Sequence, residues 1–253
     1  MTPDGGKLVE TFHCNSIDVD PANGNLLVSA RGTDSVFYID RSTGKILWKM
    51  GGSRYTKDNA THVPVTDPFY RQHDARLQPG WVHTCSGDKG QISMFDDHTA
   101  RPGPARGVVY EVTVDFADGG GVPDCGTAGD AGPTGASVAW QYAGSVSSSF
   151  YGSLRILPDG RRVIGWGLRN SDPLTFTELD VDGSDLLDFT IDPNVTNASY
   201  RAPQGPPRSV RSDGPAENRG ASVTSPQALS TTISVARCAA AKLMHALRAV
   251  PCT

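Results

Sequence analysis

The side chains best suited to chemistry are gathered in three short polar clusters of the sequence. The first is FHCNS at residues 12–16, the second is RQHDAR at 71–76, and the third is FDDHTAR at 95–101. A histidine stands in each cluster, and an arginine stands in the second and third. His13 and His73 also open two successive repeats of the chain, which is less expected by chance than one isolated histidine. We therefore take His13, His73 and Arg101 as candidates for one shared site.

Histidine and arginine together suit the chemistry of an oxyanion. A neutral imidazole is a base or nucleophile near neutral pH, and a guanidinium is a permanent cation with a planar fork for two oxygens. Two histidines with an arginine therefore fit a phosphate, sulfate or carboxylate group. The alternative is that the histidines bridge strands inside a sheet, with Asn15 and Asp74 as ordinary turn or edge partners. From residue types alone both interpretations stay open.

The elements that must position these clusters are short strands. Four runs rich in β-branched and aromatic residues, separated by Gly, Asn and Asp turns, fill residues 15–50. Two further sets of four follow, at 74–77, 91–95, 107–114 and 137–142, and at 152–157, 162–166, 174–179 and 186–190. The first set spans about 40 residues, which is the repeat length of a four-stranded propeller blade. We predict an all-β, β-propeller-like fold in which the innermost strands, with His13 and His73, line a central channel.

Three blades are too few to close a propeller, which typically has four to eight. The sequence therefore predicts about three blades of a larger fold, as a fragment, a partner in an assembly or a truncated chain. Residues 53–70, 80–90 and 117–135 are expected to be inserted loops that either cover a site or are disordered.

Composition divides the chain near residue 200. All 19 aromatic residues precede residue 201, and the last 53 residues hold seven basic but only two acidic side chains. We expect a propeller-like domain at 1–202 and a tail of low order at 203–253, with a possible helix at 232–249 where Val235, Ala239, Leu243 and Leu247 share one face.

Several classes of function are disfavoured. A net charge of -4 argues against nucleic-acid binding, and no apolar run reaches the length of a membrane span. The five cysteines include no CxxC pair, and Asp18-Val-Asp20 and Asp180-Val-Asp182 are incomplete as calcium loops. We predict no metal site; disulfides and free thiols both stay open.

Beyond these patterns, the sequence resembles the arylsulfotransferase (arylsulfate sulfotransferase) family in its fungal and actinobacterial branch. The resemblance covers roughly residues 8–202. It rests on the motifs HCNSID at 13–18, GNLLVSAR at 24–31, YIDRSTGK at 38–45, RQHDAR at 71–76, ISMFD at 92–96, LPDG at 157–160 and GWG at 165–167. It implies a six-bladed propeller that transfers a sulfuryl group from a phenolic sulfate ester to a phenol, without a nucleotide sulfate donor or another cofactor. The resemblance also implies a secreted, extracellular protein. The sequons at Asn59, Asn194 and Asn197 agree with this, although the start of the chain lacks a signal-peptide pattern.

The resemblance also implies roles for individual residues. His13 and His73 would bind the sulfate oxygens or assist proton transfer, and Arg101 would neutralise the sulfuryl oxygens, with Arg106 as its alternative. Further substrate-binding candidates are Asn15, Arg76, Arg106 and Asn170. The family mechanism is ping-pong through a sulfated histidine, expected shortly after the GWG motif, but no histidine lies between His98 and His245. Either another residue such as His73 is the nucleophile, or the chain is a non-catalytic propeller module that binds an anionic or aromatic ligand or a protein partner.

Overall fold

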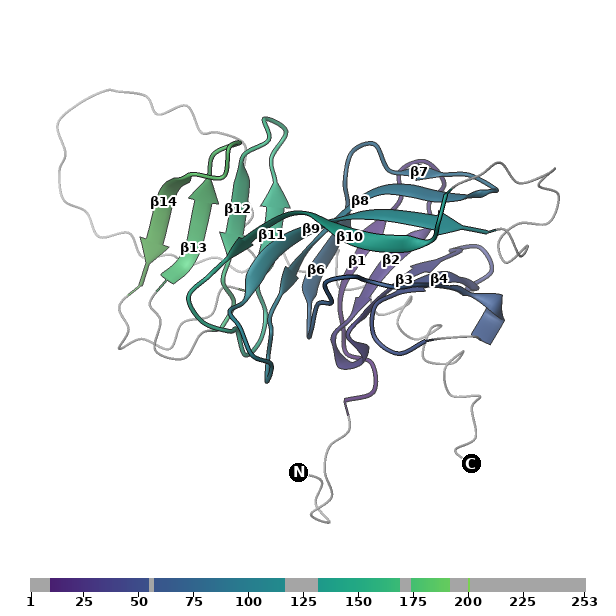
Figure 1. The fold of residues 1–253 in the computed structure, drawn as a ribbon, viewed down its shortest axis with the longest axis horizontal. Coiled ribbons are helices and arrows are strands. Elements are labelled where there is room, and N and C mark those ends of the chain that lie inside the picture. The colour runs from purple at the N-terminus through teal and green to yellow at the C-terminus, as the bar shows by residue number, and fades with distance from the viewer. Residues whose placement is uncertain (1–9, 55–56, 117–131, 169–173, 192–199, 201–253) are drawn as a thin grey trace, which may run out of the picture. The chain divides into compact units, whose positions relative to one another are not determined.

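The β-branched and aromatic runs of the sequence form strands in the computed structural model (Figure 1). The structure describes residues 10–54, 57–116, 132–168, 174–191 and 200. Contacts divide the chain into two units, Met1–Ala202 and Pro203–Thr253, and all described residues lie in the first. The possible helix at 232–249 and Asn170 fall outside the described residues.

The first sheet has five strands in the order β1-β2-β3-β4-β5. Four antiparallel strands follow one another along the chain, namely β1 (Cys14–Val19), β2 (Leu26–Ala30), β3 (Ser35–Ile39) and β4 (Ile46–Met50), with a 3₁₀ turn η1 (Arg31–Thr33) between β2 and β3. The β1–β2 turn is closed by Gly24 at φ 80° and by the Asp20 carboxylate, which accepts the backbone N–H of Ala22 at 2.9 Å.

The fifth strand corrects the prediction of a loop over residues 53–70. After the 3₁₀ turn η2 (Lys57–Asn59), the three residues of β5 (Thr61–Val63) pair in parallel with β4. A strand of three residues is too short to show alternation in a sequence, and a parallel partner gives no hairpin signal.

The second sheet has the order β10-β9-β8-β6, with β7 beside β8. Its strands are β6 (His73–Leu77), β7 (Val82–His83), β8 (Gly87–Asp96), β9 (Arg106–Asp115) and β10 (Gly135–Ala143). The loop expected at 80–90 is therefore wrong in part: β7 and the start of β8 form a small hairpin there. Backbone hydrogen bonds in both directions between Thr84 and Gly87 close its turn.

The third sheet is antiparallel in chain order. It contains β11 (Ser153–Ile156), β12 (Arg162–Gly165), β13 (Leu174–Leu179) and β14 (Asp185–Thr190). All six residues of β14 are exposed, whereas most strand residues of the first sheet are buried. The prediction of an all-β fold is confirmed at the level of three sheets, and no α-helix occurs in the part of the chain that the structure describes. No described helix is long and apolar enough to cross a membrane.

Two apolar clusters join the sheets. The first packs residues of the first sheet, such as Leu27 and Trp48, against Ile92 and Tyr110 of the second. The other places Phe95 and Val109 of the second sheet against Leu154, Ile164 and Trp166 of the third sheet. Full burial of each large side chain contributes about 1.5–3 kcal/mol.

Ion pairs join the first strands of all three sheets. Arg76 on β6 bonds to Asp74 at 2.9 Å and to Asp18 on β1 at 3.2 Å. Arg155 on β11 donates to the same Asp74 oxygen at 2.9 Å. This network holds β1, β6 and β11 close together, and β6 begins with His73.

Candidate functional site

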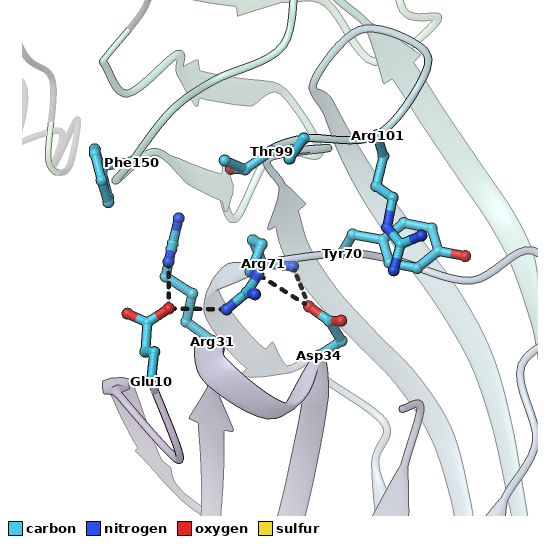
Figure 2. Close-up of a pocket in the computed structure, with 9 residues that line it drawn as sticks. Glu10, Arg31, Asp34, Tyr70, Arg71, Thr99, Arg101 and Phe150 are labelled. Atoms are coloured by element: carbon cyan, nitrogen blue, oxygen red, sulfur yellow. Dashed lines mark hydrogen bonds and ion pairs between the residues drawn. The ribbon is translucent and has the colours of Figure 1, made fainter. Parts of the chain in front are cut away.

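A cavity of about 430 Å³ lies where the ends of several strands meet (Figure 2). Its walls come from the segment before β1, the η1 turn, the segment before β6, the loop after β8 and the segment before β11. The lining residues are Glu10, Arg31, Asp34, Tyr70, Arg71, Thr99, Ala100, Arg101 and Phe150.

Left-handed backbone shapes this cavity. Asp34, Arg71 and Ala100 have φ values of 49°, 60° and 57°, a region that residues with a Cβ rarely occupy. Each such residue costs on the order of 1 kcal/mol or more, and the surrounding contacts must hold it in place. For Arg71 one such contact is the Asp34 carboxylate, which accepts its backbone N–H at 2.8 Å. The side chains of Asp34 and Arg71 both line the cavity.

The buried amide of Gln72 fixes this segment to the first sheet. Its Nε2 donates to the Ser35 carbonyl at 2.8 Å and to the Ser29 hydroxyl at 3.1 Å. Its backbone carbonyl accepts the Asn15 side-chain amide at 2.7 Å. Gln72 is fully buried, so its neighbours Arg71 and His73 are held on a rigid part of the chain.

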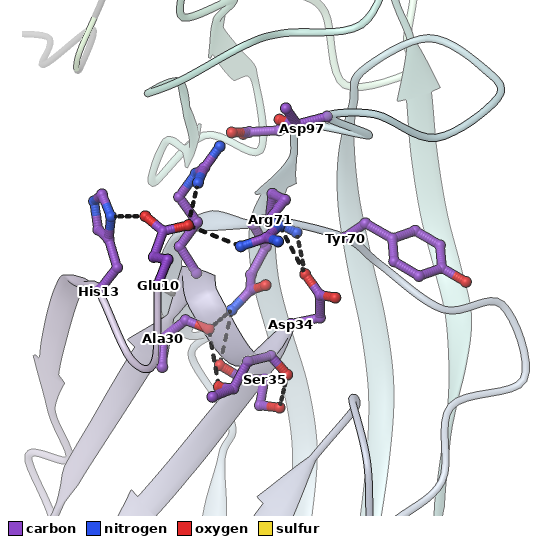
Figure 3. A network of polar contacts seen from close by, with 12 residues as sticks. Glu10, His13, Ala30, Asp34, Ser35, Tyr70, Arg71 and Asp97 are labelled. Carbon is purple, nitrogen blue, oxygen red and sulfur yellow. Dashed lines mark hydrogen bonds and ion pairs between the residues drawn. The ribbon is translucent and has the colours of Figure 1, made fainter. Parts of the chain in front are cut away.

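Glu10 connects the cavity to His13. One of its carboxylate oxygens contacts His13 Nδ1, and the other accepts Arg31 Nη1 at 2.6 Å and Arg71 Nη1 at 2.8 Å (Figure 3). Burial raises the pKa of Glu10, but the His13 hydrogen bond and the charges of Arg31 and Arg71 outweigh it, so the pKa lies below its ordinary value. The carboxylate is therefore ionised at neutral pH.

The cavity is cationic and partly aromatic. Arg31, 4% exposed, donates through Nη2 to the Ser149 carbonyl at 3.0 Å and stacks over the Phe150 ring at 4.8 Å. Arg101 is exposed and lies 4.5 Å from the centre of the Tyr70 ring. Three guanidinium groups therefore face two carboxylates, and two aromatic rings stand beside them.

The structure brings His13 and His73 together, with ring centres 6.5 Å apart. His13 has φ 50° and an exposed ring, whereas His73 is 3% exposed and its Nδ1 lies 3.1 Å and 3.0 Å from the two oxygens of Asp97. The rings of Tyr151 and Tyr200 lie 6.4 Å and 6.5 Å from His73. Neither histidine lines the cavity, and Glu10 is the link between His13 and the cavity arginines.

Asp97 is fully buried, and its pKa is raised well above the ordinary value. Burial is the main cause, the charge of Asp96 adds to it, and Arg31 acts in the opposite direction. The pair of His73 and Asp97 therefore combines an imidazole with a carboxyl group that favours its protonated form.

The other predicted binding residues are engaged by the chain itself. Asn15 bonds to Gln72 and Asp74, and Arg76 bonds to Asp18, Asp74 and the Ile17 carbonyl. Arg106 is buried, and its three nitrogens contact Asp96, Asp67, Gln141, Pro68 and Tyr110. None of these three residues lines the cavity, and their binding roles stay predictions, as does that of Asn170, which is outside the described residues.

Sequence reasoning missed Glu10, Arg31 and Phe150. Arg31 carried one signal, because a charged residue directly after a buried apolar run must find a partner. Among the described residues, no three His, Cys, Asp or Glu side chains gather as a metal site would require. Cys14 and Cys85, the cysteines within the described ranges, are free thiols.

Comparison with known proteins adds a family to this geometry. No curated protein matches the chain significantly. One similar solved structure is a protein of unknown function from Bacteroides caccae, with 11% sequence identity over 76% of this chain and 86% of that chain. Its TM-score of 0.24 is too low to support an argument about the fold. The family model of arylsulfotransferase (ASST) matches residues 2–184. The chain therefore belongs to the arylsulfotransferase family.

Proposed function

We propose that this chain transfers a sulfuryl group from a phenolic sulfate ester to a phenol acceptor. The observation that carries the proposal is the cavity, in which Arg31, Arg71 and Arg101 stand beside the rings of Tyr70 and Phe150. Membership of the arylsulfotransferase family supports the same reaction.

The cavity suits both halves of an aryl sulfate. The ester carries one negative charge over three sulfuryl oxygens, which are acceptors for guanidinium N–H groups. Its phenyl ring is complementary to the faces of aromatic side chains. A volume of about 430 Å³ falls within the range of small-molecule sites. Positive groups at the sulfuryl oxygens also stabilise the charge that shifts during transfer.

The two neighbouring histidines supply the groups for a two-step reaction. In the first step a histidine nitrogen bonds to sulfur as the aryl oxygen–sulfur bond breaks and the phenolate leaves. In the second step the acceptor oxygen bonds to sulfur and the nitrogen–sulfur bond breaks. The acceptor's proton replaces the one that the departing phenolate takes up, so the histidine is regenerated. His13, whose ring is exposed, is more accessible to a sulfate ester than the buried His73.

The three sheets support a propeller arrangement for this site. We infer it because β1, β6 and β11, the first strands of the three sheets, are joined by the pairs of Asp18, Asp74, Arg76 and Arg155. Innermost strands of propeller blades meet around a common axis in the same way.

An assay with 4-nitrophenyl sulfate and phenol tests the function through the absorbance of released nitrophenolate. We expect Arg101→Ala to lower the rate by about 10²–10³-fold, the usual effect of losing one donor to a developing charge. The matched control is Arg161→Ala, which removes a partly exposed arginine of the third sheet that pairs with Asp159 and Glu178 and does not line the cavity. A wild-type protein that releases no more nitrophenol than the double variant His13→Ala/His73→Ala would contradict the enzymatic function.

The second candidate is a non-catalytic module that binds an anionic aromatic ligand. It is favoured by the absence of histidine from the residues described around the cavity. Binding of 4-nitrophenyl sulfate that depends on Arg101, with no release of nitrophenol, would support this candidate over the enzyme.

A further inference from the structure

We propose that Arg31 and Arg71 form an oxyanion-binding pair which Glu10 of the same chain occupies, so that a sulfate group binds there only when the Glu10 side chain moves away. The ligand class rests on the proposed function, because a sulfate ester is the anion that the cavity would receive. The competition with Glu10 is a separate statement about this chain.

The geometry around Glu10 is that of a bound oxyanion. A single carboxylate oxygen accepts Nη1 of Arg31 at 2.6 Å and Nη1 of Arg71 at 2.8 Å, and the other oxygen contacts His13 (Figure 3). The three donors come from different segments, before β1, after β2 and before β6. Donors that converge on one carboxylate from separate elements would converge equally on a sulfate.

Arg31 has donor capacity that Glu10 does not use. Its Nη1 bonds to Glu10 and its Nη2 to the Ser149 carbonyl, but its buried Nε has no hydrogen-bond partner among the described residues. Glu10 brings one oxygen to the pair, whereas a sulfate ester has three terminal oxygens that can accept from the arginines. Because Arg31 is only 4% exposed, it requires a counter-anion, and either Glu10 or a bound sulfate meets that need.

The exchange requires movement of a side chain but not of the backbone. The backbone near Glu10 is fixed, since Gly32 donates to the Phe12 carbonyl at 2.9 Å and Arg31 donates to the His13 carbonyl at 3.0 Å. A Cβ on Gly32 would lie 2.4 Å from the Glu10 carbonyl oxygen, so the close approach depends on glycine. The Glu10 side chain itself is 32% exposed, which gives its carboxylate a solvated position to which it can rotate.

Competition of this kind predicts the direction in which sulfate affinity changes when Glu10 is removed. A ligand that binds only when Glu10 has left shows an affinity reduced by the fraction of molecules in which the pair is vacant. If Glu10 occupies the pair in nine molecules of ten or more, its removal strengthens sulfate binding by about 10-fold or more. If Glu10 instead holds the arginines in place for the ligand, its removal weakens binding.

Calorimetric titration with inorganic sulfate distinguishes these outcomes. We expect Glu10→Gln to lower the sulfate Kd about 10-fold or more, because the amide is the same size but carries no charge. Glu111→Gln is the matched control, since the Glu111 carboxylate accepts the Gln91 side-chain amide at 3.1 Å and does not line the cavity. Arg71→Gly in the Glu10→Gln background should abolish the gain, and glycine accepts the φ of 60° at this position without strain.

Each outcome bears on the proposal. An unchanged or larger Kd in Glu10→Gln overturns it, as does a gain that survives the Arg71→Gly change. Glu10→Asp provides a second variant if Glu10→Gln folds poorly: its shorter side chain cannot reach both arginines, and we expect an intermediate gain. Sulfate should also raise the Tm of Glu10→Gln more than that of the wild type, because the tighter binder gains more from the same ligand concentration.

The sulfate titration needs no turnover, so it separates this proposal from the proposed function. If the wild type transfers no sulfuryl group but Glu10→Gln binds sulfate more tightly, the proposed function is contradicted and the competition with Glu10 is supported. If the wild type turns over 4-nitrophenyl sulfate but Glu10→Gln binds sulfate no more tightly, the proposed function is supported and the competition is contradicted.

Discussion

Two buried arginines of this protein stand in contrasting surroundings. Arg106 uses Nε for Asp96 at 3.0 Å, Nη1 for Asp67 and Gln141 at 2.6 Å each, and Nη2 for the Pro68 carbonyl and the Tyr110 hydroxyl at 3.3 Å each. Arg31 shares one carboxylate with Arg71, leaves Nε without a described partner, and lines a cavity.

The contrast shows that residue type alone does not separate a structural arginine from a binding one. Both residues are buried and both are paired with acids, but all three nitrogens of Arg106 have partners within the fold, whereas Nε of Arg31 has none among the described residues. An arginine whose three nitrogens all have partners, such as Arg106, stabilises the fold. An arginine that lines a cavity and has a donor without a partner, such as Arg31, can bind a ligand. The predictions below test this distinction, beginning with the closed cluster around Arg106.

The largest expected effect is the loss of stability in Arg106→Met. Methionine fills much of the space but leaves Asp96 buried without its cation, which typically costs about 3–5 kcal/mol. The urea midpoint of unfolding measures this loss. Arg161→Met, which removes a partly exposed arginine of the third sheet, is the control and should leave the midpoint nearly unchanged. Equal midpoints for the two variants would show that the cluster around Arg106 does not stabilise the fold.

Replacing either of the adjacent residues Asp96 and Asp97 by asparagine is expected to change the stability by an intermediate amount, in opposite directions. Both are fully buried. Asp96 accepts Arg106 Nε at 3.0 Å and the Tyr70 backbone N–H at 2.9 Å, so Asp96→Asn should destabilise the protein by about 2 kcal/mol. Asp97→Asn should instead stabilise it at neutral pH, by about 1 kcal/mol.

The sign for Asp97 follows from its pKa, which the fold raises above the ordinary value. Stability from such a group is fully present below the unfolded pKa of about 3.9 and is lost as the pH rises through the folded pKa. Asparagine stays neutral at every pH, so the advantage of Asp97→Asn should grow as the pH rises. Thermal melts of both variants between pH 4 and 8 measure this, and a parallel loss of Tm in both would contradict the proposed contrast.

Much of the fold can be predicted from the sequence because its strands are bounded by turn residues. The apolar run at 25–31 corresponds to β2 (Leu26–Ala30), and the run at 45–50 to β4 (Ile46–Met50). The strands β5 and β7 could not be predicted, because two or three residues carry no periodicity and their pairing depends on distant partners.

Part of this region could be predicted from residue types and spacing. Of the three catalytic candidates, Arg101 lines the cavity, and the rings of His13 and His73 lie 6.5 Å apart beside it without lining it. The role of Glu10 could not be predicted, because its contacts with Arg31 and Arg71 join residues 21 and 61 positions apart. Arg71 also reaches Glu10 from a left-handed backbone, which its own sequence cluster does not signal.

The smallest expected effect is the pH dependence of the contact between His98 and the closed cluster. His98 Nε2 lies 3.2 Å from Asp96 Oδ2, and Nδ1 lies 3.1 Å from the Pro102 carbonyl. The hydrogen bond with Asp96 raises the pKa of His98 and outweighs the opposite effect of burial. Because the folded pKa lies above the unfolded value of about 6.5, this stability is present below pH 6.5 and is lost as the pH rises through the folded pKa. We expect His98→Gln to unfold more readily than the wild type at pH 6, by less than about 1 kcal/mol, and to match it at pH 9. Urea unfolding at both pH values measures the difference. A penalty of the same size at pH 9 would mean that the ring stabilises the loop by packing on Tyr70, from which its centre lies 5.8 Å, and that its charge contributes nothing.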